Sequence, residues 1–572
     1  MITLTIDNTQ ITVNKETSIL EAARKANINI PTLCHIEGME GFGACRLCVV
    51  EIAGEPLLAL SCSRKVSNGM QVKTNTERIR KSRRMIIELL LANHNAYCPT
   101  CERSQHCDLQ KLAFDLGVKN VRFKIERESL KLDESSMAII RDPNKCILCG
   151  KCVRICHQVQ TVNVINFFNR GTDLTISTAM DKGLGNVECV GCGQCIHVCP
   201  SGAIKERSSI DKIWAEISNP DKHVVVQEAP SIRAALGEDL GVPTGSLVTG
   251  KMHAALKKLG FDAVFDTNFT ADLTIIEEGN ELVKRIKEGG TLPMITSCCP
   301  GWIKFAEHFY PDLLPHLSTC KSPQQMFGAL AKTYYPQKAG IDPAKVVSVS
   351  MMPCTAKKFE AQRPEMEDSG FRDVDYVLTT RELSKMIKEA GLDFANLQEE
   401  KAEELLGAYS GAATIFGATG GVMEAALRTA YKLITGNELT DVDIFPVRGL
   451  EGIKETSITL NSMEVRLAVA HGLGNARTLL EQIRSKTSPY HFIEIMACPG
   501  GCVGGGGQPY GFDMKTREIR GQALYNEDRV LIHRKSHENS EVSRLYQEYL
   551  CEPLGEKSHK LLHTHYTLRS LV

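Results

Sequence analysis

Two runs of cysteines with the same spacing constrain this chain more than any other feature. The first run reads Cys146-x2-Cys149-x2-Cys152-x3-Cys156, and the second reads Cys189-x2-Cys192-x2-Cys195-x3-Cys199, followed by Pro200. Thiolates at these intervals are ligands of iron-sulfur clusters, and eight of them in a repeat leave essentially no other interpretation. Any fold of the chain must bring these segments around metal clusters.

The repeat is the motif of bacterial two-cluster ferredoxins, in which the fourth cysteine of each run ligates the other cluster. We therefore expect two 4Fe-4S clusters. The predicted ligands of one are Cys146, Cys149, Cys152 and Cys199, and those of the other are Cys156, Cys189, Cys192 and Cys195. We assign this domain to residues 128–208.

Composition limits the remaining possibilities. At 572 residues the chain is too long for a single core, and its 67 basic and 68 acidic residues leave no charge excess that would favour nucleic acid. The alternating start, Met1–Asp7, is a strand pattern and not a signal peptide, and the apolar runs are too short to span a membrane. Without an export signal, 22 cysteines indicate metal ligation and not disulfides. We expect a soluble, cytoplasmic protein without nucleic-acid or membrane partners.

Residues 1–78 carry a different cysteine pattern. Strands are predicted at Ile2–Ile6 and Ile11–Val13, and a helix is predicted to begin at Ser18, with Glu21 completing a capping box. Four thiols follow, and their spacing suits either zinc or a 2Fe-2S cluster: Cys34, Cys45, Cys48 and Cys62. The pattern resembles the variant ferredoxin domain of hydrogenases and of NADH dehydrogenases. That resemblance implies a β-grasp fold and one 2Fe-2S cluster.

Residues 79–127 contain a mixed ligand set. A helix predicted at Glu77–Ala92 leads into His94-x3-Cys98-x2-Cys101-x5-Cys107. One imidazole and three thiolates could form a structural zinc site. The set resembles the His-ligated 4Fe-4S domain of the same two families, which makes this cluster the third accessory 4Fe-4S cluster. His106 is expected to be an ordinary surface histidine.

Residues 209–572 have a different pattern of apolar residues from the cysteine-rich part of the chain. Apolar runs at 224–226, 263–265 and 346–350 alternate with helical stretches at 231–237 and 379–390, the latter capped by Thr379 and Glu382. This alternation predicts α/β layers with near-parallel strands. The tail, 536–566, is predicted to be helical and to wrap the domain. The fold class is therefore multidomain, α+β and α/β.

Three motifs in this last region contain cysteines in turns. They read Thr296-Ser-Cys-Cys-Pro-Gly-Trp302, Met351-Met-Pro-Cys-Thr-Ala-Lys-Lys358 and Met496-Ala-Cys-Pro-Gly-Gly-Cys-Val-Gly-Gly-Gly-Gly-Gln-Pro509. The motifs resemble the signatures of FeFe (iron-only) hydrogenases, and the order of the accessory domains resembles the large monomeric clostridial type. The resemblance implies an H-cluster: a 4Fe-4S cubane and a diiron subcluster with carbon monoxide, cyanide and a bridging dithiolate that contains an amine. Its implied cubane ligands are Cys299, Cys354, Cys498 and Cys502.

Side chains near these motifs are candidates for holding the diiron unit. Lys357 is placed to donate a charge-assisted hydrogen bond to a cyanide, although a lone lysine is more often solvated. The resemblance also suggests Pro230 and Ser231 for the second cyanide, and Gln324 for the pocket wall. Met352 and Met496 flank the ligands and suit a dry metal pocket or plain core packing. Residues 500–507 and 416–424 lack P-loop and GxGxxG patterns, which favours close backbone approach to the cluster.

Adjacent thiols cannot easily bind one metal, so one of Cys298 and Cys299 is expected to be a ligand and the other to handle protons. The resemblance implies that Cys299 is the ligand and Cys298 the proton carrier. Glu278 and Glu281 share a helical face with Arg285, a pattern that alone favours a solvated, salt-bridged surface. The family resemblance instead implies a proton route whose members are Cys298, Glu278, Ser318, Glu281 and Arg285. Cys320 and Cys551 are expected to be ordinary thiols.

The sequence thus predicts a ferredoxin-dependent FeFe hydrogenase that interconverts H2 with protons and electrons. The implied partners are a soluble ferredoxin or flavodoxin and the maturases that supply the diiron unit, with the chain itself a monomer. Two alternatives remain: an inactive iron-sulfur assembly protein with a hydrogenase-like fold, and an electron-input subunit of a larger complex. No flavin or NAD fingerprint is present.

Overall fold

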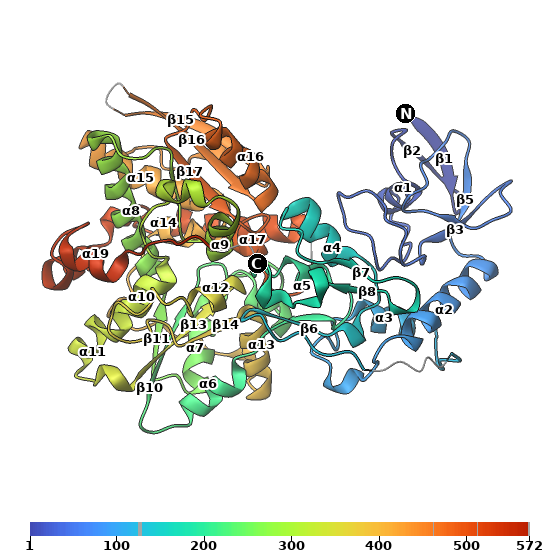
Figure 1. Cartoon of the computed structure of the whole chain (residues 1–572), viewed down its shortest axis with the longest axis horizontal. Coiled ribbons are helices and arrows are strands. Elements are labelled where there is room, and N and C mark those ends of the chain that lie inside the picture. The colour runs from blue at the N-terminus through green and yellow to red at the C-terminus, as the bar shows by residue number, and fades with distance from the viewer. Residues whose placement is uncertain (124–128, 461–462, 512, 570–572) are drawn as a thin grey trace. The chain divides into compact units, whose positions relative to one another are not determined.

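The computed structural model describes residues 1–123, 129–460, 463–511 and 513–569 (Figure 1). Internal contacts divide the chain into two compact units. The first comprises residues 1–157, 163–187 and 195–205, and the second comprises residues 158–162, 188–194 and 206–572. The four-domain division predicted from the sequence is finer than this and stays a prediction. Among the described residues, no helix is long and apolar enough to cross a membrane.

The first unit begins with a mixed five-stranded sheet in the order β2-β1-β5-β3-β4. Its strands are β1 (Ile2–Ile6), β2 (Thr9–Val13), β3 (Val49–Ile52), β4 (Ala59–Leu60) and β5 (Gln71–Lys73). Helix α1 (Ile19–Lys25) is capped by Ser18, whose hydroxyl accepts from the Glu21 N–H while the Glu21 side chain accepts from the Ser18 N–H. The two predicted strands are confirmed, the second beginning at Thr9 instead of Ile11, and so is the capping box.

The remainder of the first unit consists of short elements around the cysteine loops. Helix α2 (Glu77–Ala92) has the predicted bounds, and the Thr76 hydroxyl caps it by accepting from the Ile79 N–H at 3.3 Å. The other elements are α3 (Asp108–Asp115), β6 (Ile139–Arg141), α4 (Lys151–Arg154), β7 (Asn166–Phe168), β8 (Thr175–Ser177), α5 (Gln194–Val198) and β9 (Ile204–Glu206).

The second unit contains a four-stranded, fully parallel sheet in the order β11-β10-β13-β14. Its strands are β10 (His223–Glu228), β11 (Ala263–Asp266), β13 (Val346–Met352) and β14 (Tyr376–Thr379). The three apolar runs predicted as strands lie in β10, β11 and β13. These strands read as continuous apolar runs because helices cover both faces of the sheet.

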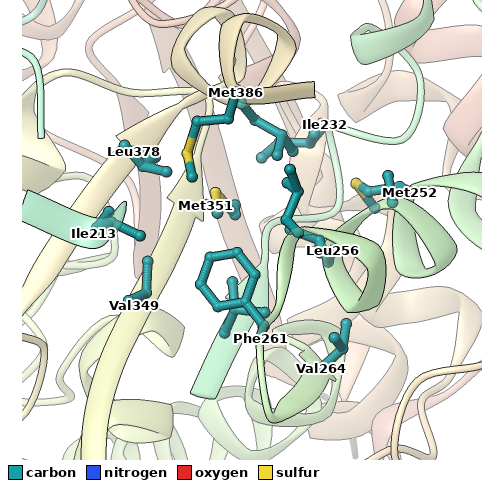
Figure 2. Packing of buried hydrophobic residues seen from close by; sticks show 14 of the residues in the cluster. Ile213, Ile232, Met252, Leu256, Phe261, Val264, Val349, Met351, Leu378 and Met386 are labelled. Carbon is teal, nitrogen blue, oxygen red and sulfur yellow. The ribbon is translucent and has the colours of Figure 1, made fainter. Parts of the chain in front are cut away.

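Successive residues of β10 point into different cores. Val224 and Val226 belong to one apolar cluster with α6 (Ile210–Ile217), α7 (Thr249–Leu259) and α13 (Thr380–Glu389). Figure 2 shows part of this cluster, with Leu256 of α7 and Met386 of α13 beside Met351 of β13 and Met252 of α7 beyond Leu256. Val225 belongs to a second cluster with α8 (Asn268–Glu288) and α10 (Pro323–Lys332).

A second sheet has the order β12-β17-β16-β15, with β15 antiparallel to its neighbour. Its strands are β12 (Met294–Ile295), β15 (Ile453–Leu460), β16 (Met463–His471) and β17 (Phe492–Met496). The other helices are α9 (Pro300–Phe309), α11 (Tyr334–Ala339), α12 (Ala356–Glu360), α14 (Gly411–Thr414), α15 (Gly421–Thr435), α16 (Leu473–Arg484), α17 (Met514–Val530), α18 (Ser540–Leu545) and α19 (Glu556–Leu562). The tail therefore contains helices, as predicted.

One predicted helix is wrong. Residues 231–235 form successive turns that lead into the 3-10 helix η7 (Leu236–Leu240). The Arg233 guanidinium is completely buried and lies 2.7 Å from both Glu228 and Asp266. These ion pairs fix the chain directly after β10, and apolar spacing alone could not reveal them. The capping box of Thr379 and Glu382 on α13 is confirmed.

Candidate active site

A pocket lies at the carboxyl ends of parallel strands from both sheets of the second unit. The turns after β10, β12, β13 and β17 all contribute to its wall. Ligands of parallel α/β sheets bind at these strand ends. Half of the wall consists of residues singled out from the sequence: Pro230, Ser231, Cys298, Cys299, Gln324, Met352, Cys354, Lys357, Met496, Cys498 and Cys502.

Four thiols in this pocket, of which Cys498 is buried and the other three are half-buried, interact with one another. Burial, together with the charge of Cys299, raises the pKa of Cys354 to about 12. Burial likewise raises the pKa values of Cys498 and Cys502, and the neighbouring cysteines add to both shifts. Thiols in such surroundings ionise readily only when a metal group supplies compensating positive charge. The donor set and the mostly apolar wall therefore fit an iron-sulfur cubane held by Cys299, Cys354, Cys498 and Cys502.

Lys357 faces this pocket from α12. Its Nζ donates to the main-chain oxygen of Cys298 at 3.1 Å and lies 2.8 Å from Oε2 of Glu360. Burial disfavours the ammonium, but the Glu360 carboxylate holds the pKa of Lys357 above its usual value. Glu360 also accepts from Ser322 Oγ at 2.9 Å and from Gln324 Nε2 at 3.0 Å. Glu360, which the sequence analysis missed, connects Lys357 and Gln324.

Ser231 is held by another residue that the sequence analysis missed. Gln508 Nε2 donates to the Ser231 carbonyl at 3.2 Å and to the Cys502 carbonyl at 3.3 Å, while its Oε1 accepts from Thr380 Oγ1 at 2.9 Å. The amide thereby ties the turn after β10 to the turn that carries Cys502. The only sequence feature that could have indicated Gln508 is its position directly after the glycine run.

The glycine run packs against the segment 188–194, which belongs to the same unit and carries Cys189 and Cys192. Gln194 Nε2 donates to the Gly504 carbonyl at 2.9 Å, and Thr355 Oγ1 donates to the Gly191 carbonyl at 2.6 Å. A Cβ on Gly506 would lie 2.3 Å from the Cys192 carbonyl oxygen. The glycines therefore allow the two backbone segments to approach each other closely.

The predicted proton-route carboxylates are buried on α8. Glu278 is 2% exposed and Glu281 is 7% exposed, so the interpretation as a solvated face is wrong. Burial and the nearby Glu281 charge raise the pKa of Glu278 to about 8. Ser318 Oγ donates to Glu281 Oε2 at 2.8 Å, and Arg285 Nη2 lies 2.6 Å from Glu281 Oε1.

Cys298 lies in the pocket wall beside Cys299. Burial raises the pKa of its thiol well above the usual value, and the Glu278 charge is the next largest cause. Cys298 is thus the thiol of the adjacent pair that interacts with the buried carboxylates. Its role as a proton carrier stays a prediction.

The first unit also gathers its cysteines. Cys34, Cys45, Cys48 and Cys62 are all buried and perturb one another's pKa values, with hydrogen bonds between Cys34 and Cys45 and between Cys48 and Cys62 as the largest effects. The Leu33 N–H donates to Cys45 Sγ at 3.4 Å. Four convergent thiols with backbone donors fit a 2Fe-2S cluster.

His94 is oriented by a hydrogen bond between Nδ1 and the Lys145 carbonyl at 3.0 Å. Such a bond leaves Nε2 available as a ligand, which is the usual arrangement of metal-binding histidines. Cys98, Cys101 and Cys107 are half-buried in the same unit. His106 is exposed, as expected.

A small cavity in the first unit is lined by Cys146, Cys149, Cys152 and Cys199. Burial raises the pKa of Cys149, and Cys199 is the next cause. The fourth cysteine of the second run therefore lies with the first three of the first run, as the crossed pattern requires. The complementary set of Cys156, Cys189, Cys192 and Cys195 stays a prediction.

Comparison with known families assigns a domain to each region. Residues 222–506 match the iron only hydrogenase large subunit, C-terminal domain, and residues 514–569 match the iron hydrogenase small subunit. The accessory matches are a 2Fe-2S iron-sulfur cluster binding domain (1–77), the NADH-ubiquinone oxidoreductase-G iron-sulfur binding region (83–122) and a 4Fe-4S dicluster domain (145–203).

Whole-chain relatives decide the family. The chain is 49% identical to the NADP-reducing hydrogenase subunit HndD of Solidesulfovibrio fructosivorans over 100% of this chain and 99% of the relative. It is 42% identical to iron hydrogenase 1 of Clostridium pasteurianum over 99% of this chain and 100% of the relative. The chain belongs to the iron-only (FeFe) hydrogenase family.

A solved structure supports the same assignment. The [FeFe]-hydrogenase HydA(deltaEFG), described in work on stepwise H-cluster assembly, matches this hydrogenase with a TM-score of 0.58 and 44% identity, over 63% of this chain and 99% of that chain. The coarse prediction of an iron-sulfur hydrogenase with an H-cluster domain is therefore confirmed.

Proposed function

We propose that this hydrogenase interconverts H2 with two protons and two electrons and exchanges electrons with a soluble ferredoxin or flavodoxin. The observation that carries the proposal is the docking of segment 188–194 on the pocket. Cys189 and Cys192 of the ferredoxin-type run lie on a segment whose neighbours, Gly191 and Gln194, bond the turns of the Cys354 and Cys502 motifs. A cluster held there would be positioned to exchange electrons with the cubane.

The residues present fit one 2Fe-2S cluster, three accessory 4Fe-4S clusters and an H-cluster whose cubane is held by the four pocket thiols. When bound, the H-cluster supplies the open iron position at which H2 is split or formed and the bridging amine that exchanges protons with the protein. Lys357 and Ser231 would hold its cyanide ligands by hydrogen bonds. Met352 and Met496 line the pocket with apolar side chains and would help to exclude water from the bound cluster.

The chain's own contribution to proton transfer begins at Cys298. Its thiol receives or returns the proton exchanged at the pocket and passes it to the Glu278 carboxylate. The Ser318 hydroxyl then carries the proton to Glu281, to which it already donates at 2.8 Å. A carboxyl whose pKa lies near 8 can both accept and release a proton near neutral pH, which suits Glu278 for the middle of this route. Arg285 pairs with Glu281 and holds it in place.

One observation favours a second candidate for the electron partner, a nicotinamide-linked complex. The relative HndD is named a subunit of an NADP-reducing hydrogenase, so this chain could instead serve as the hydrogenase subunit of a nicotinamide-linked complex. The predictions of a monomer, of a cytoplasmic location and of dependence on maturases belong to the ferredoxin proposal. They distinguish it from a complex, in which partner subunits would copurify.

The test is an anaerobic assay of the matured, purified chain. We expect infrared bands of carbon monoxide and cyanide, H2 evolution from reduced ferredoxin or flavodoxin, and no H2 evolution from NADPH. Activity with NADPH, or a copurifying nicotinamide-binding subunit, would support the second candidate instead. Absence of the infrared bands after maturation would remove the H-cluster assignment altogether.

A further inference from the structure

Arg517 of α17 packs against the turn that carries two of the expected cubane ligands, Cys498 and Cys502. The side chain is 2% exposed. A Cβ on Gly504 would lie 2.8 Å from Arg517 Nε, and a Cβ on Gly500 would lie 3.4 Å from Arg517 Cδ. The two glycines therefore leave the room that the arginine occupies, and its charge lies beside the ligand turn.

Polar contacts fix the guanidinium in this place. Its Nη2 donates to Gln194 Oε1 at 3.4 Å, and its Nη1 lies 3.6 Å from Met514 Sδ. The Gln194 side chain also donates from Nε2 to the Gly504 carbonyl at 2.9 Å. Gln194 thus bonds both the arginine and the turn against which the arginine packs.

The charges around Arg517 differ from those around Arg520, which lies one turn further along α17. Arg520 pairs with Glu238 at 2.6 Å. Burial lowers the pKa of Arg517 to about 10, and the Cys498 charge is the largest effect that opposes this shift. Asp513, which caps α17, opposes it to a smaller extent. Arg517 therefore stays protonated at neutral pH and is a fixed positive charge that acts on Cys498.

Two buried cations divide the four pocket thiols between them. Burial raises the pKa values of these thiols; the Lys357 charge opposes the rise at three of them, and the Arg517 charge opposes it at the fourth, Cys498. Lys357 lies in the pocket wall. Arg517 instead contacts the glycine run and segment 188–194, which carries Cys189 and Cys192. Arg517 is thus the cation on the side from which the proposed electron transfer reaches the pocket.

We propose that Arg517 raises the reduction potential of the cubane held by the four pocket thiols. The proposal rests on the proposed function, because it assumes the H-cluster. A positive charge fixed beside a group that gains an electron stabilises the reduced form, and this effect is strong where water is excluded. Reduction adds one electron, which the accessory clusters supply, and no bond forms or breaks at Arg517. Without this charge, a smaller fraction of the cubane would be reduced at a given potential of the electron partner.

The first test is an infrared titration of the matured, full-length protein. Only the diiron unit, joined to the cubane through Cys502, carries carbon monoxide and cyanide, so a shift of their bands with applied potential reports on this cubane and not on the accessory clusters. In Arg517→Gln, the ratio of reduced to oxidised cubane at the wild-type midpoint should fall about tenfold, a shift of about 59 mV for a one-electron couple. Arg517→Lys keeps the charge and should restore most of the potential. Arg529→Gln, at an exposed position of the same helix, is the matched control.

The second test leaves Arg517 in place. Gln194→Glu puts a carboxylate at the contact with Arg517 Nη2, which offsets the guanidinium charge and should lower the midpoint. Gln194→Met removes the same amide without adding a charge and should lower the midpoint much less. This pair of variants decides the matter if Arg517→Gln does not retain its cubane.

Three results would count against the proposal. An unmoved midpoint in Arg517→Gln with the infrared bands present would overturn it. Equal falls in Arg517→Gln and Arg517→Lys would attribute the shift to packing and not to charge, and equal midpoints in Gln194→Glu and Gln194→Met would have the same meaning. Absence of the bands from the matured wild type would refute the H-cluster itself and, with it, this role of Arg517.

Discussion

Lys357 Nζ lies 2.8 Å from Glu360 Oε2 and 3.1 Å from the main-chain oxygen of Cys298. Both charged residues lie on α12, directly after the Cys354 turn, and both are buried. A buried ammonium is tolerated only when it is paired, so the carboxylate decides where Lys357 points. Glu360 is therefore a positioning residue for Lys357.

We predict that Glu360→Gln weakens both the fold and the hold on the diiron unit. Removing one partner of a buried ion pair costs about 3–5 kcal/mol, so the melting temperature should fall. The infrared bands of cyanide should shift, because Lys357 would no longer be fixed, and turnover should fall about tenfold. Glu367→Gln, at an exposed carboxylate, is the control. Unchanged cyanide bands in Glu360→Gln would contradict the positioning role.

Local signals made part of the fold predictable. The bounds of α2 and the capping boxes of α1 and α13 depend on residues within one turn of a helix end, so the sequence reveals them directly. The helix predicted at 231–237 is wrong because Arg233 forms ion pairs with residues of two other elements, and these pairs hold residues 231–235 in turns. Tertiary contacts of that kind have no periodic signal.

The residues of the site likewise include some that the sequence could indicate and some that it could not. Cysteine ligands recur at fixed intervals, so their spacing alone is enough to indicate them. Glu360 and Gln508 act on Lys357 and Ser231 through contacts that no spacing reveals. Glu278 and Glu281 have the pattern of a surface helix, and only their burial beneath neighbouring elements distinguishes them from one.

We predict that Cys298→Ala lowers turnover without preventing assembly of the clusters. Because Cys298 is not an expected ligand, iron content and infrared bands should match those of the wild type. Turnover should fall by about 100-fold or more, since a proton carrier is lost. Cys551→Ala, which removes an exposed thiol, is the control. H2 evolution at the wild-type rate in the Cys298 variant would exclude this thiol from proton transfer.

The raised pKa of Glu278 predicts how stability depends on pH. In the unfolded chain this carboxyl titrates near 4.5, and in the folded chain near 8. The folded state therefore binds more protons between these values, and its stability falls as pH rises through that window. The difference in melting temperature, Glu278→Gln minus wild type, should consequently increase from pH 5 to pH 9. Glu288→Gln, at an exposed position on α8, should not. A difference that does not change with pH would refute the raised pKa.

The crossed ligation of the ferredoxin-type runs can be tested by combining variants. Cys149 and Cys199 line one cavity, so Cys149→Ala and Cys199→Ala should each remove the same 4Fe-4S signal from the paramagnetic resonance spectrum of the reduced protein. The double variant should lose no more iron than either single variant, whereas Cys199→Ala combined with Cys195→Ala should lose about twice as much. Additive iron loss in the Cys149 and Cys199 pair would contradict the crossed pattern.

A single methyl group should damage the pocket at Gly505. A Cβ there would lie 2.2 Å from the Pro353 carbonyl oxygen and 2.9 Å from that of Cys502. Both neighbours are backbone atoms next to expected cubane ligands, so Gly505→Ala must displace Cys354, Cys502 or both. We expect lower iron content and a lower melting temperature. In Gly521→Ala, within α17, the nearest atom is Ala418 Cβ at 3.9 Å, and helix propensity favours alanine by about 1 kcal/mol. That control should keep its iron and melt at or above the wild-type temperature, and full iron content in Gly505→Ala would show that the glycine is not required for the ligand turns.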